Sequence, residues 1–284
     1  KGLEYSLQLK NVEVIHAKAS FVDDHTVTAN GISYFAKHIV IASGSSVVIP
    51  PILGLTNRNS YTSKSILELR EIPQHLVVIG GGIIGLEMAS IFLDYGAKVT
   101  VVEAESRILS FMDKELTKRL QMDLTKRGVT FYVNTRVVQI EEDGRNRIVS
   151  MSQQSQEHKI SCSHILVATG RKANIQSLDL HNTSIKVIDG AIKTNEDFQT
   201  NVPHIYAIGD CNQKWMLAHA ASASAKHVLQ KILNKPSYTR FDLMPNCLYT
   251  HLQFASVGIQ EAELLEQEAK YRTHKYPFRA TAMA

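Results

Sequence analysis

The sequence has no long apolar segment and no block of positive charge. No apolar run approaches the roughly 18 residues that a membrane-spanning helix requires, and the opening residues KGLEY lack the apolar core of a signal peptide. The formal net charge is only +4, and the basic residues of 114–127 alternate with acids and leucines. We therefore expect a globular protein with no membrane and no nucleic-acid partner.

Cysteine is also scarce. The three cysteines, Cys162, Cys211 and Cys247, lie far apart and show no C-x-x-C spacing. The sequence thus predicts neither a disulfide framework nor a metal site, and buried free thiols are consistent with a reducing, cytoplasmic compartment. The first residue is lysine rather than methionine, so we expect the chain to begin inside a longer protein. Its 284 residues are enough for roughly two domains.

The most informative stretch is residues 76–103, LVVIGGGIIGLEMASIFLDYGAKVTVVE. An apolar strand is followed by Gly80, Gly82 and Gly85 in G-x-G-x-x-G spacing, a helix over 85–95, and a second strand over 98–102. Glu103 follows that strand, 18 residues after Gly85. The glycines alone are weak evidence, and a glycine-rich turn in an ordinary α/β protein is the alternative. The complete strand–turn–helix–strand–acid order favours a dinucleotide site.

Each position has a physical role in such a site. Gly80 allows a sharp turn off the strand, Gly82 lets a pyrophosphate approach the backbone, and Gly85 lets the helix pack closely against the strand. The start of the helix then offers free N–H groups to the phosphates. The carboxylate of Glu103 can accept both hydroxyls of an adenosine ribose and would repel a 2′-phosphate, so the sequence predicts NAD rather than NADP.

The remainder of the chain predicts further strands and helices. We expect short strands over 11–15 and 38–42, a hairpin turn at Asn30–Gly31, an antiparallel meander over 136–169, and one strand or two over 243–259. Expected helices cover 62–70, 113–127, 216–233 and 261–270, and the chain ends in what looks like another strand. In the helix over 113–127, Leu116, Leu120 and Leu124 are expected on one buried face.

Two segments on either side of the dinucleotide stretch are similar to each other. Residues 38–44 are HIVIASG and residues 164–170 are HILVATG. The similarity is either a coincidence between two strands or a sign of two related nucleotide-binding folds, one nested in the other. Later, Asp210 follows an apolar strand and precedes a long helix. It is placed to bind a polar ligand at a sheet edge or to serve as a turn residue.

Several motifs together resemble the pyridine-nucleotide–disulfide oxidoreductase family, and above all its dihydrolipoamide dehydrogenases. The motifs are IASGS (41–45), IPP (49–51), GGGIIGLE (80–87), GAKVTVVE (96–103), ATGRKAN (168–174), TNVPHIYAIGDC (200–211), MLAHAA (216–221), LYT (248–250) and ASVGIQEAE (255–263). The resemblance implies an α/β protein with two nested Rossmann-like, three-layer nucleotide-binding domains and the start of an α+β interface domain. It divides the chain into part of an FAD-binding domain (1–71), an NAD-binding domain (72–190), the return of the FAD-binding domain (191–237) and the start of the dimerisation domain (238–284).

The resemblance also implies roles for individual residues. Those of the NAD site are Gly80, Gly82, Ile83, Gly85, Glu87, Glu103, Val137 and Gly170. Those of the FAD site are Ser43, Gly44, Ser45, Asp210, Met216, Leu217, Ala218 and His219. The implied activity passes electrons from dihydrolipoamide through a cysteine pair and FAD to NAD. The implied partners are a second copy of the chain and a 2-oxoacid dehydrogenase complex.

Some features of the family are absent from these 284 residues. There is no first FAD glycine motif, no redox-active cysteine pair and no histidine in the family's catalytic His–Glu context, so no catalytic residue is predicted here. The expected result is a chain that binds NAD(H), retains FAD poorly and performs no dithiol chemistry by itself. Alternatives are a related reductase acting on mercuric ion or coenzyme A disulfide, and a catalytically dead paralogue used as a structural subunit.

Overall fold

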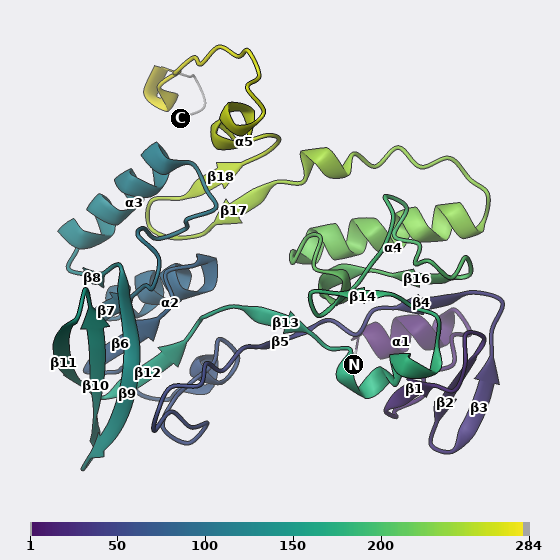
Figure 1. Cartoon of the computed structure of the whole chain (residues 1–284), viewed down its shortest axis with the longest axis horizontal. Helices are drawn as coiled ribbons and strands as arrows, with labels where there is room; N and C mark the ends of the chain where they lie inside the picture. The colour runs from purple at the N-terminus through teal and green to yellow at the C-terminus, as the bar shows by residue number, and fades with distance from the viewer. Residues whose placement is uncertain (1, 281–284) are drawn as a thin grey trace. The chain divides into compact units, whose positions relative to one another are not determined.

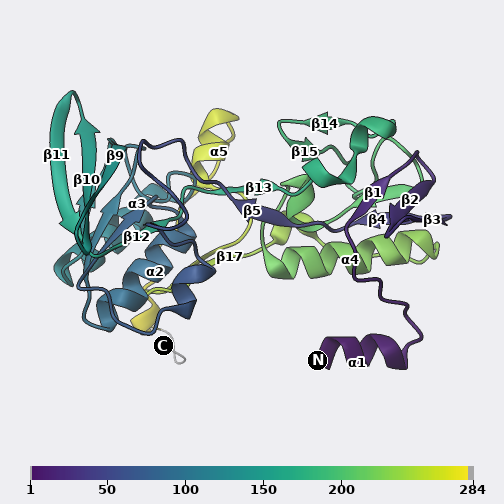
Figure 2. The same cartoon turned by 90° about the horizontal axis from the view of Figure 1, so that it is seen from below.

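The computed structural model describes residues 2–280, which form two compact units (Figures 1 and 2). Unit 1 consists of residues 2–48 and 170–241, and unit 2 consists of residues 49–169 and 242–280. Unit 1 is therefore built from two stretches of chain that are separated by the excursion over 49–169. Both units mix helices with sheets, as the sequence predicted.

A parallel four-stranded sheet forms the centre of unit 2, in the order β12-β6-β7-β8. The strands are β6 (His75–Ile79), β7 (Lys98–Val102), β8 (Thr130–Tyr132) and β12 (His164–Val167). In the register of the sheet, Leu76 lies opposite His164 on one side and Val99 on the other. Because β6 is central, its apolar run is buried on both faces, which is the usual position of a continuous apolar strand.

Alternate residues of β6 face two different layers. Leu76 and Val78 pack with the helices α2 (Ile83–Asp94) and α3 (Lys114–Lys126). Val77 and Ile79 pack against an antiparallel sheet on the other side (Figure 1). This second sheet is the meander β9 (Thr135–Asp143), β10 (Asn146–Gln153) and β11 (Gln156–Cys162). The three-layer α/β fold predicted for this part of the chain is confirmed.

The helix α3 shows how local sequence sets its ends. The Asp113 side chain accepts a hydrogen bond from the Leu116 N–H at 2.9 Å, which caps the first turn. After the last turn, Gly128 adopts a φ of 114°. Leu120 and Leu124 are buried as expected, but Leu116 is 41% exposed, because it lies in the first turn at the rim of the helix layer.

Unit 1 contains several small sheets. Its centre is the parallel pair β4 (Ile39–Ile41) and β16 (Ile205–Ala207), with Ile39 opposite Ile205. Around it are β1 (Ala19–Phe21), β2 (Thr26–Ala29), β3 (Ile32–Phe35), β5 (Ser45–Val47), β13 (Arg171–Ala173), β14 (Val187–Ile188), β15 (Ala191–Ile192) and the helix α4 (Ala218–Ile232). Asn30 and Gly31 join β2 to β3 with φ values of 52° and 76°, so the predicted hairpin turn is confirmed.

The C-terminal part of unit 2 begins with two strands rather than one. These are β17 (Asn246–Leu248) and β18 (Phe254–Ser256), which pair antiparallel, and the short helix α5 (Glu261–Glu266) follows them. Leu248 is fully buried in the core that contains Leu76 and Leu86. Short 3₁₀ helices cover Ser65–Glu68 (η1), Gln176–Leu178 (η2), Leu180–Asn182 (η3), Gly209–Asn212 (η4), Phe241–Leu243 (η5) and Phe278–Ala280 (η6).

Five local predictions were wrong, wholly or in part. The antiparallel meander expected over 136–169 ends at Cys162, because residues 164–167 form β12 of the parallel sheet. Residues 11–15 alternate like a strand but are exposed and pair with no strand among residues 2–280; alternation cannot form a strand without a neighbour to hydrogen-bond. The helix α1 (Gly2–Leu9) was not predicted. The helix expected over 62–70 is only η1, and the one over 261–270 ends at Glu266. The final strand is absent over 271–280, and residues 281–284 lie outside the described chain.

The three cysteines should differ sharply in reactivity. Cys162 is 2% exposed and burial raises its pKa to about 12, while burial also raises the pKa of Cys211. For Cys162 the shift lowers the thiolate fraction at pH 8 by roughly a thousandfold. Cys247 is only half-buried. A disulfide reagent at pH 8 is therefore expected to modify Cys247 quickly and the other two only after unfolding in urea. Cys247→Ser should abolish the fast phase of modification. A thiol that still reacts quickly in that variant would contradict the burial of Cys162 and Cys211.

Candidate functional site

The turn between β6 and α2 forms an open site at the carboxyl edge of the parallel sheet. Gly82 is the residue before α2 and makes no side-chain cap. A Cβ built at Gly82 would meet no atom within 4 Å, so the backbone here is uncovered. An uncapped helix start with an exposed backbone can receive an anion, because the first N–H groups of a helix have no partner within the helix.

Two glycines of the same turn are required by close contacts. Gly80 has a φ of 110°, and a Cβ there would lie 2.4 Å from the Ala168 carbonyl oxygen. A Cβ at Gly85 would lie 2.1 Å from the carbonyl oxygen of Gly80. The helix thus starts directly against the end of β6, which only glycine at these positions allows.

These contacts predict unequal losses of stability for two glycine substitutions. Gly85→Ala is expected to lower the free energy of unfolding by about 2–3 kcal/mol, because the new methyl group overlaps a backbone oxygen that cannot move away. Gly82→Ala should cost no more than about 1 kcal/mol, since it adds a methyl group in open space at a helix cap. Urea unfolding followed by circular dichroism measures both. Equal losses in the two variants would contradict the close packing of α2 on β6.

Glu103 lies at the end of β7, next to this turn. Its carboxylate accepts hydrogen bonds from the Gly81 N–H at 2.6 Å and from the Glu105 N–H at 2.7 Å. A carboxylate offers about four acceptor positions, so two remain for other donors. Glu103 thus both supports the glycine turn and presents acceptors beside it.

The other residues predicted for the NAD site have different surroundings. Ile83 is the first residue of α2 and packs in part against the helix-side core. The Glu87 carboxylate accepts a hydrogen bond from the Tyr249 N–H at 2.9 Å, so it also anchors the end of β17. Val137 lies half-buried on β9 in the other core. Gly170 has a φ of 115° and belongs to unit 1, whereas the glycine turn belongs to unit 2.

A second polar site lies in unit 1, where β4 and β16 end at the same edge. Asp210 follows β16 in η4, and Ser45 follows β4 by way of Ser43 and Gly44. The Ser45 hydroxyl donates to the Asp210 carboxylate at 2.5 Å. The strands β4 and β16 are far apart in sequence but pair in parallel, and this pairing brings Ser43, Gly44 and Ser45 close to Asp210.

Arg171 completes this cluster and was not assigned a role from the sequence. Its Nε donates to the Ser45 hydroxyl and its Nη2 to the Ser45 carbonyl, both at 2.7 Å. Its Nε lies 3.8 Å from the Asp210 carboxylate. Asn174 similarly donates to the Ser43 carbonyl at 3.1 Å. Both residues belong to the ATGRKAN motif, so that motif could have indicated them.

The N-terminal end of α4 lies on the chain shortly after Asp210. Leu217 is the residue before this helix and makes no side-chain cap, and the first turn contains Ala218 and His219. Met216 is 38% exposed. The helix start is therefore a source of positive potential that no side chain of the cap position neutralises.

The residues of both sites fit nucleotide cofactors. In unit 2, the exposed backbone at Gly82 and the spare acceptors of Glu103 suit a pyrophosphate and a ribose. In unit 1, the Ser43 hydroxyl is buried without a hydrogen-bond partner among the described residues, and a Cβ at Gly44 would meet no atom within 4 Å. An unpaired buried hydroxyl beside an open backbone position suits a polar ligand, since such groups are normally paired.

The fold and the two sites define an α/β protein with one dinucleotide-binding unit inserted into a second nucleotide-binding unit. Comparison with known families agrees: residues 1–225 match the family described as pyridine nucleotide-disulphide oxidoreductase, and residues 244–284 match the dimerisation domain of the same family. The chain therefore belongs to the pyridine nucleotide-disulphide oxidoreductase family. Proteins of this family are flavin-dependent oxidoreductases that use FAD and NAD or NADP.

Individual relatives resemble the chain over nearly all of its length. The mitochondrial dihydrolipoyl dehydrogenase 1 of Arabidopsis thaliana is 32% identical over 100% of this chain and 58% of its own length. The mercuric reductase of Staphylococcus aureus is 31% identical over 96% of this chain and 50% of its own. The HOCl-induced flavoprotein disulfide reductase RclA of Escherichia coli has a similar structure, with a TM-score of 0.87 and 26% identity over 99% of this chain and 66% of its own. The chain thus spans about three fifths of the first dehydrogenase.

Residues 2–280 contain neither a membrane-spanning helix nor a metal-site cluster. In that range, no helix is long and apolar enough to cross a membrane. Nor does any group of three or more histidine, cysteine, aspartate or glutamate side chains there have the arrangement of a metal site.

Proposed function

We propose that the whole protein is a dihydrolipoamide dehydrogenase, which passes electrons from dihydrolipoamide through a cysteine pair and FAD to NAD. The observation that supports it most is the alignment of this entire chain with several dihydrolipoyl dehydrogenases at 32–34% identity, as with the pea mitochondrial protein at 34%. In this proposal, the two candidate sites described above bind the nucleotides that such a reaction requires.

In this proposal unit 2 binds the electron acceptor, NAD. Gly80 and Gly85 shape the turn, and Gly82 and the start of α2 receive the pyrophosphate. Glu103 accepts the ribose hydroxyls, which favours NAD over NADP. Ile83 and Val137 provide apolar contacts for the nicotinamide and adenine, and Glu87 lines the rest of the site.

Unit 1 binds FAD in the same proposal, and FAD supplies the two-electron chemistry when it is bound. Ser43, Gly44 and Ser45 contact its backbone, and Asp210 accepts hydrogen bonds from its sugar-alcohol chain. Arg171 holds the Ser45 hydroxyl and balances the charge of Asp210. The residues Met216, Leu217, Ala218 and His219 bring the start of α4 to the flavin, where the positive end of the helix stabilises negative charge that develops on reduction.

We further propose a domain assignment and partners. The FAD-binding domain comprises 1–71 and 191–237, the NAD-binding domain 72–190, and the interface domain starts at 238. The excursion over 49–169 between the two parts of unit 1 supports this nested order, although it begins and ends earlier in the chain than the proposed NAD-binding domain does. The match to a dimerisation domain supports a homodimer, and a 2-oxoacid dehydrogenase complex is the proposed larger partner.

Buried free thiols support a reducing compartment, which we propose to be the cytoplasm, with the mitochondrion of the plant relatives as the alternative.

A reductase with another substrate is the second candidate, because mercuric reductase is among the relatives. The test uses the whole protein, purified and scanned for flavin absorbance, and then assayed for NAD reduction with dihydrolipoamide and for NADPH oxidation with mercuric ion. Flavin absorbance with dihydrolipoamide-dependent NAD reduction is expected. Turnover with mercuric ion alone would favour the second candidate, and a colourless protein that still binds NADH would reduce the function to nucleotide binding.

A further inference from the structure

The segment that follows α4 turns back and lies along this helix. Lys235 donates its N–H to the Gln230 carbonyl at 2.8 Å, and Asn234 has a φ of 53°, so the helix ends in a left-handed reversal. The segment over 234–241 then leads from α4 to η5 (Figure 1). We call residues 234–241 the strap.

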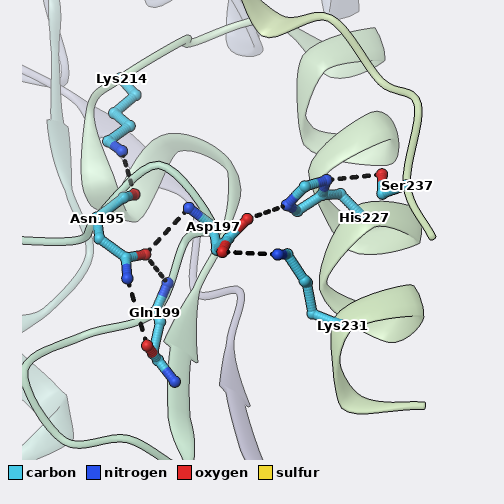
Figure 3. A network of polar contacts seen from close by, with 7 residues as sticks. All are labelled: Asn195, Asp197, Gln199, Lys214, His227, Lys231 and Ser237. Carbon is cyan, nitrogen blue, oxygen red and sulfur yellow. Dashed lines mark hydrogen bonds and ion pairs between the residues drawn. The ribbon is translucent and has the colours of Figure 1, made fainter. Parts of the chain in front are cut away.

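A polar contact holds the middle of the strap. The His227 ring, on α4 and 8% exposed, bonds the Ser237 hydroxyl through Nδ1 at 2.7 Å and the Asp197 carboxylate through Nε2 at 2.8 Å (Figure 3). Lys231 adds an ion pair to the second oxygen of Asp197 at 2.9 Å. Burial acts to raise the pKa of Asp197, but hydrogen bonds from Lys231 and His227 outweigh it and lower the pKa. An ionised Asp197 therefore fixes the histidine that receives the strap.

An aromatic contact holds the end of the strap. The Phe241 ring lies 4.7 Å from the ring centre of Phe198 and 5.4 Å from that of Trp215. The ring centres of Phe241 and His227 lie 5.4 Å apart, and the two rings are nearly perpendicular. Phe198 is 1% exposed, so this cluster is a small core of its own. Edge-to-face contacts of this kind contribute beyond the apolar area that they bury.

The same cluster fixes the loop that enters α4. Asn212 donates to the Ala207 carbonyl at 2.8 Å and accepts from the Lys214 N–H at 3.0 Å. The Lys214 ammonium bonds the Asn195 carbonyl (Figure 3). It also lies 5.3 Å from the centre of the Phe198 ring. Trp215 then packs under Phe241, directly before Met216 and the uncapped start of α4.

We propose that the strap positions the N-terminal end of α4, with Phe241 and His227 as the positioning residues. The strap lies near the C-terminal half of the helix, but its aromatic end holds Trp215 at the other end of the same helix. The positioning follows from the contacts above. Its consequence for FAD rests on the proposed function, in which the start of α4 faces the flavin.

The serine–histidine–aspartate contacts of Ser237, His227 and Asp197 have the same order as those of the catalytic triad of serine hydrolases. Here the serine follows the C-terminal end of α4, where the helix dipole is negative and would destabilise the oxyanion of an acyl-transfer reaction. The serine hydroxyl therefore serves to attach the strap rather than to attack a substrate.

The first test compares Phe241→Ala with Tyr238→Ala in the 284-residue chain. Tyr238 lies in the same strap but is 87% exposed, so it is a matched control. Trp215 is the only tryptophan and reports the cluster by its fluorescence. Phe241→Ala is expected to make Trp215 more accessible to acrylamide and to speed hydrogen exchange of the amides at 216–221 by about tenfold. Phe241→Tyr, which keeps the ring, should behave like the unchanged chain.

One further variant and one further measurement keep the test decisive. Ser237→Ala removes only the hydroxyl and should speed exchange in the strap while the unfolding midpoint stays unchanged. In the whole protein, Phe241→Ala should weaken FAD binding by about tenfold and make the flavin potential more negative, and Tyr238→Ala should do neither.

The outcomes separate the inference from the proposed function. Equal exchange at 216–221 in Phe241→Ala and Tyr238→Ala would overturn the positioning role. Unchanged FAD affinity with faster exchange would overturn only its consequence for the flavin. A whole protein that binds no FAD at all would overturn the proposed function and leave the exchange result standing. Covalent labelling of Ser237 by a fluorophosphonate would overturn the inference in favour of a hydrolase.

Discussion

Replacing Gly82 with valine is expected to weaken NADH binding by about a hundredfold, which corresponds to the loss of two hydrogen bonds to charged phosphate oxygens. The side chain would fill the open space above the start of α2, where the pyrophosphate would lie. Gly82 has an extended backbone, with φ −81° and ψ −177°, that valine adopts easily. The fold should therefore survive, with a loss of about 1 kcal/mol in the free energy of unfolding for the altered cap.

Titration of NADH fluorescence measures the affinity, and urea unfolding measures the stability of the same samples. Gly2→Val is a control with the same change in side chain, because a Cβ at Gly2 also meets no atom within 4 Å and lies in unit 1. NADH binding by Gly82→Val that equals that of the control would show that the turn does not receive the pyrophosphate.

Changing Glu103 to arginine is expected to shift the ratio of NAD to NADP affinity by about a hundredfold toward NADP, because a repulsive charge near the 2′-position is replaced by an attractive one. Absolute affinity for both nucleotides should fall as well. The carboxylate supports the turn by accepting from the N–H groups of Gly81 and Glu105, and arginine has no acceptor.

Two matched variants separate these effects. Glu103→Gln keeps an acceptor oxygen but loses the charge, so it should reduce the preference for NAD without reversing it. Glu105→Arg introduces the same change of charge two residues away, at an exposed side chain, and should alter the ratio by less than about threefold. An unchanged NAD:NADP ratio in Glu103→Arg would remove the basis for assigning the ribose to this residue.

The sequence predicted best where strong patterns have buried partners. The run over 76–79, the helix α3 and the turn at Asn30–Gly31 were all located to within a few residues, because their patterns depend on local geometry and on one buried face. The segment over 11–15 failed for the complementary reason. Its alternation is that of a strand, but a strand also requires a neighbour, and a single sequence does not show whether one is present.

The candidate sites were predictable to different degrees. The glycine turn and Glu103 follow a spacing with a known mechanical meaning, so both could be found by reading along the chain. The contact of Arg171 with Ser45 joins residues 126 apart and depends on the pairing of β5 with β13, which no local pattern reveals. Glu87 is similar: its hydrogen bond to Tyr249 links it to a hairpin 162 residues away.

The excursion over 49–169 begins and ends at one point of unit 1. The Val48 N–H bonds the Gly170 carbonyl at 3.0 Å, just outside the two ends of the excursion. Closing an unfolded loop of this length costs chain entropy that grows only with the logarithm of its length. Once the excursion has folded, bonds between Tyr61 and β12 hold its two ends near each other. Folding of the excursion before unit 1 would therefore lower the entropic cost of joining the two stretches of unit 1, so that the excursion assists the folding of the unit that surrounds it.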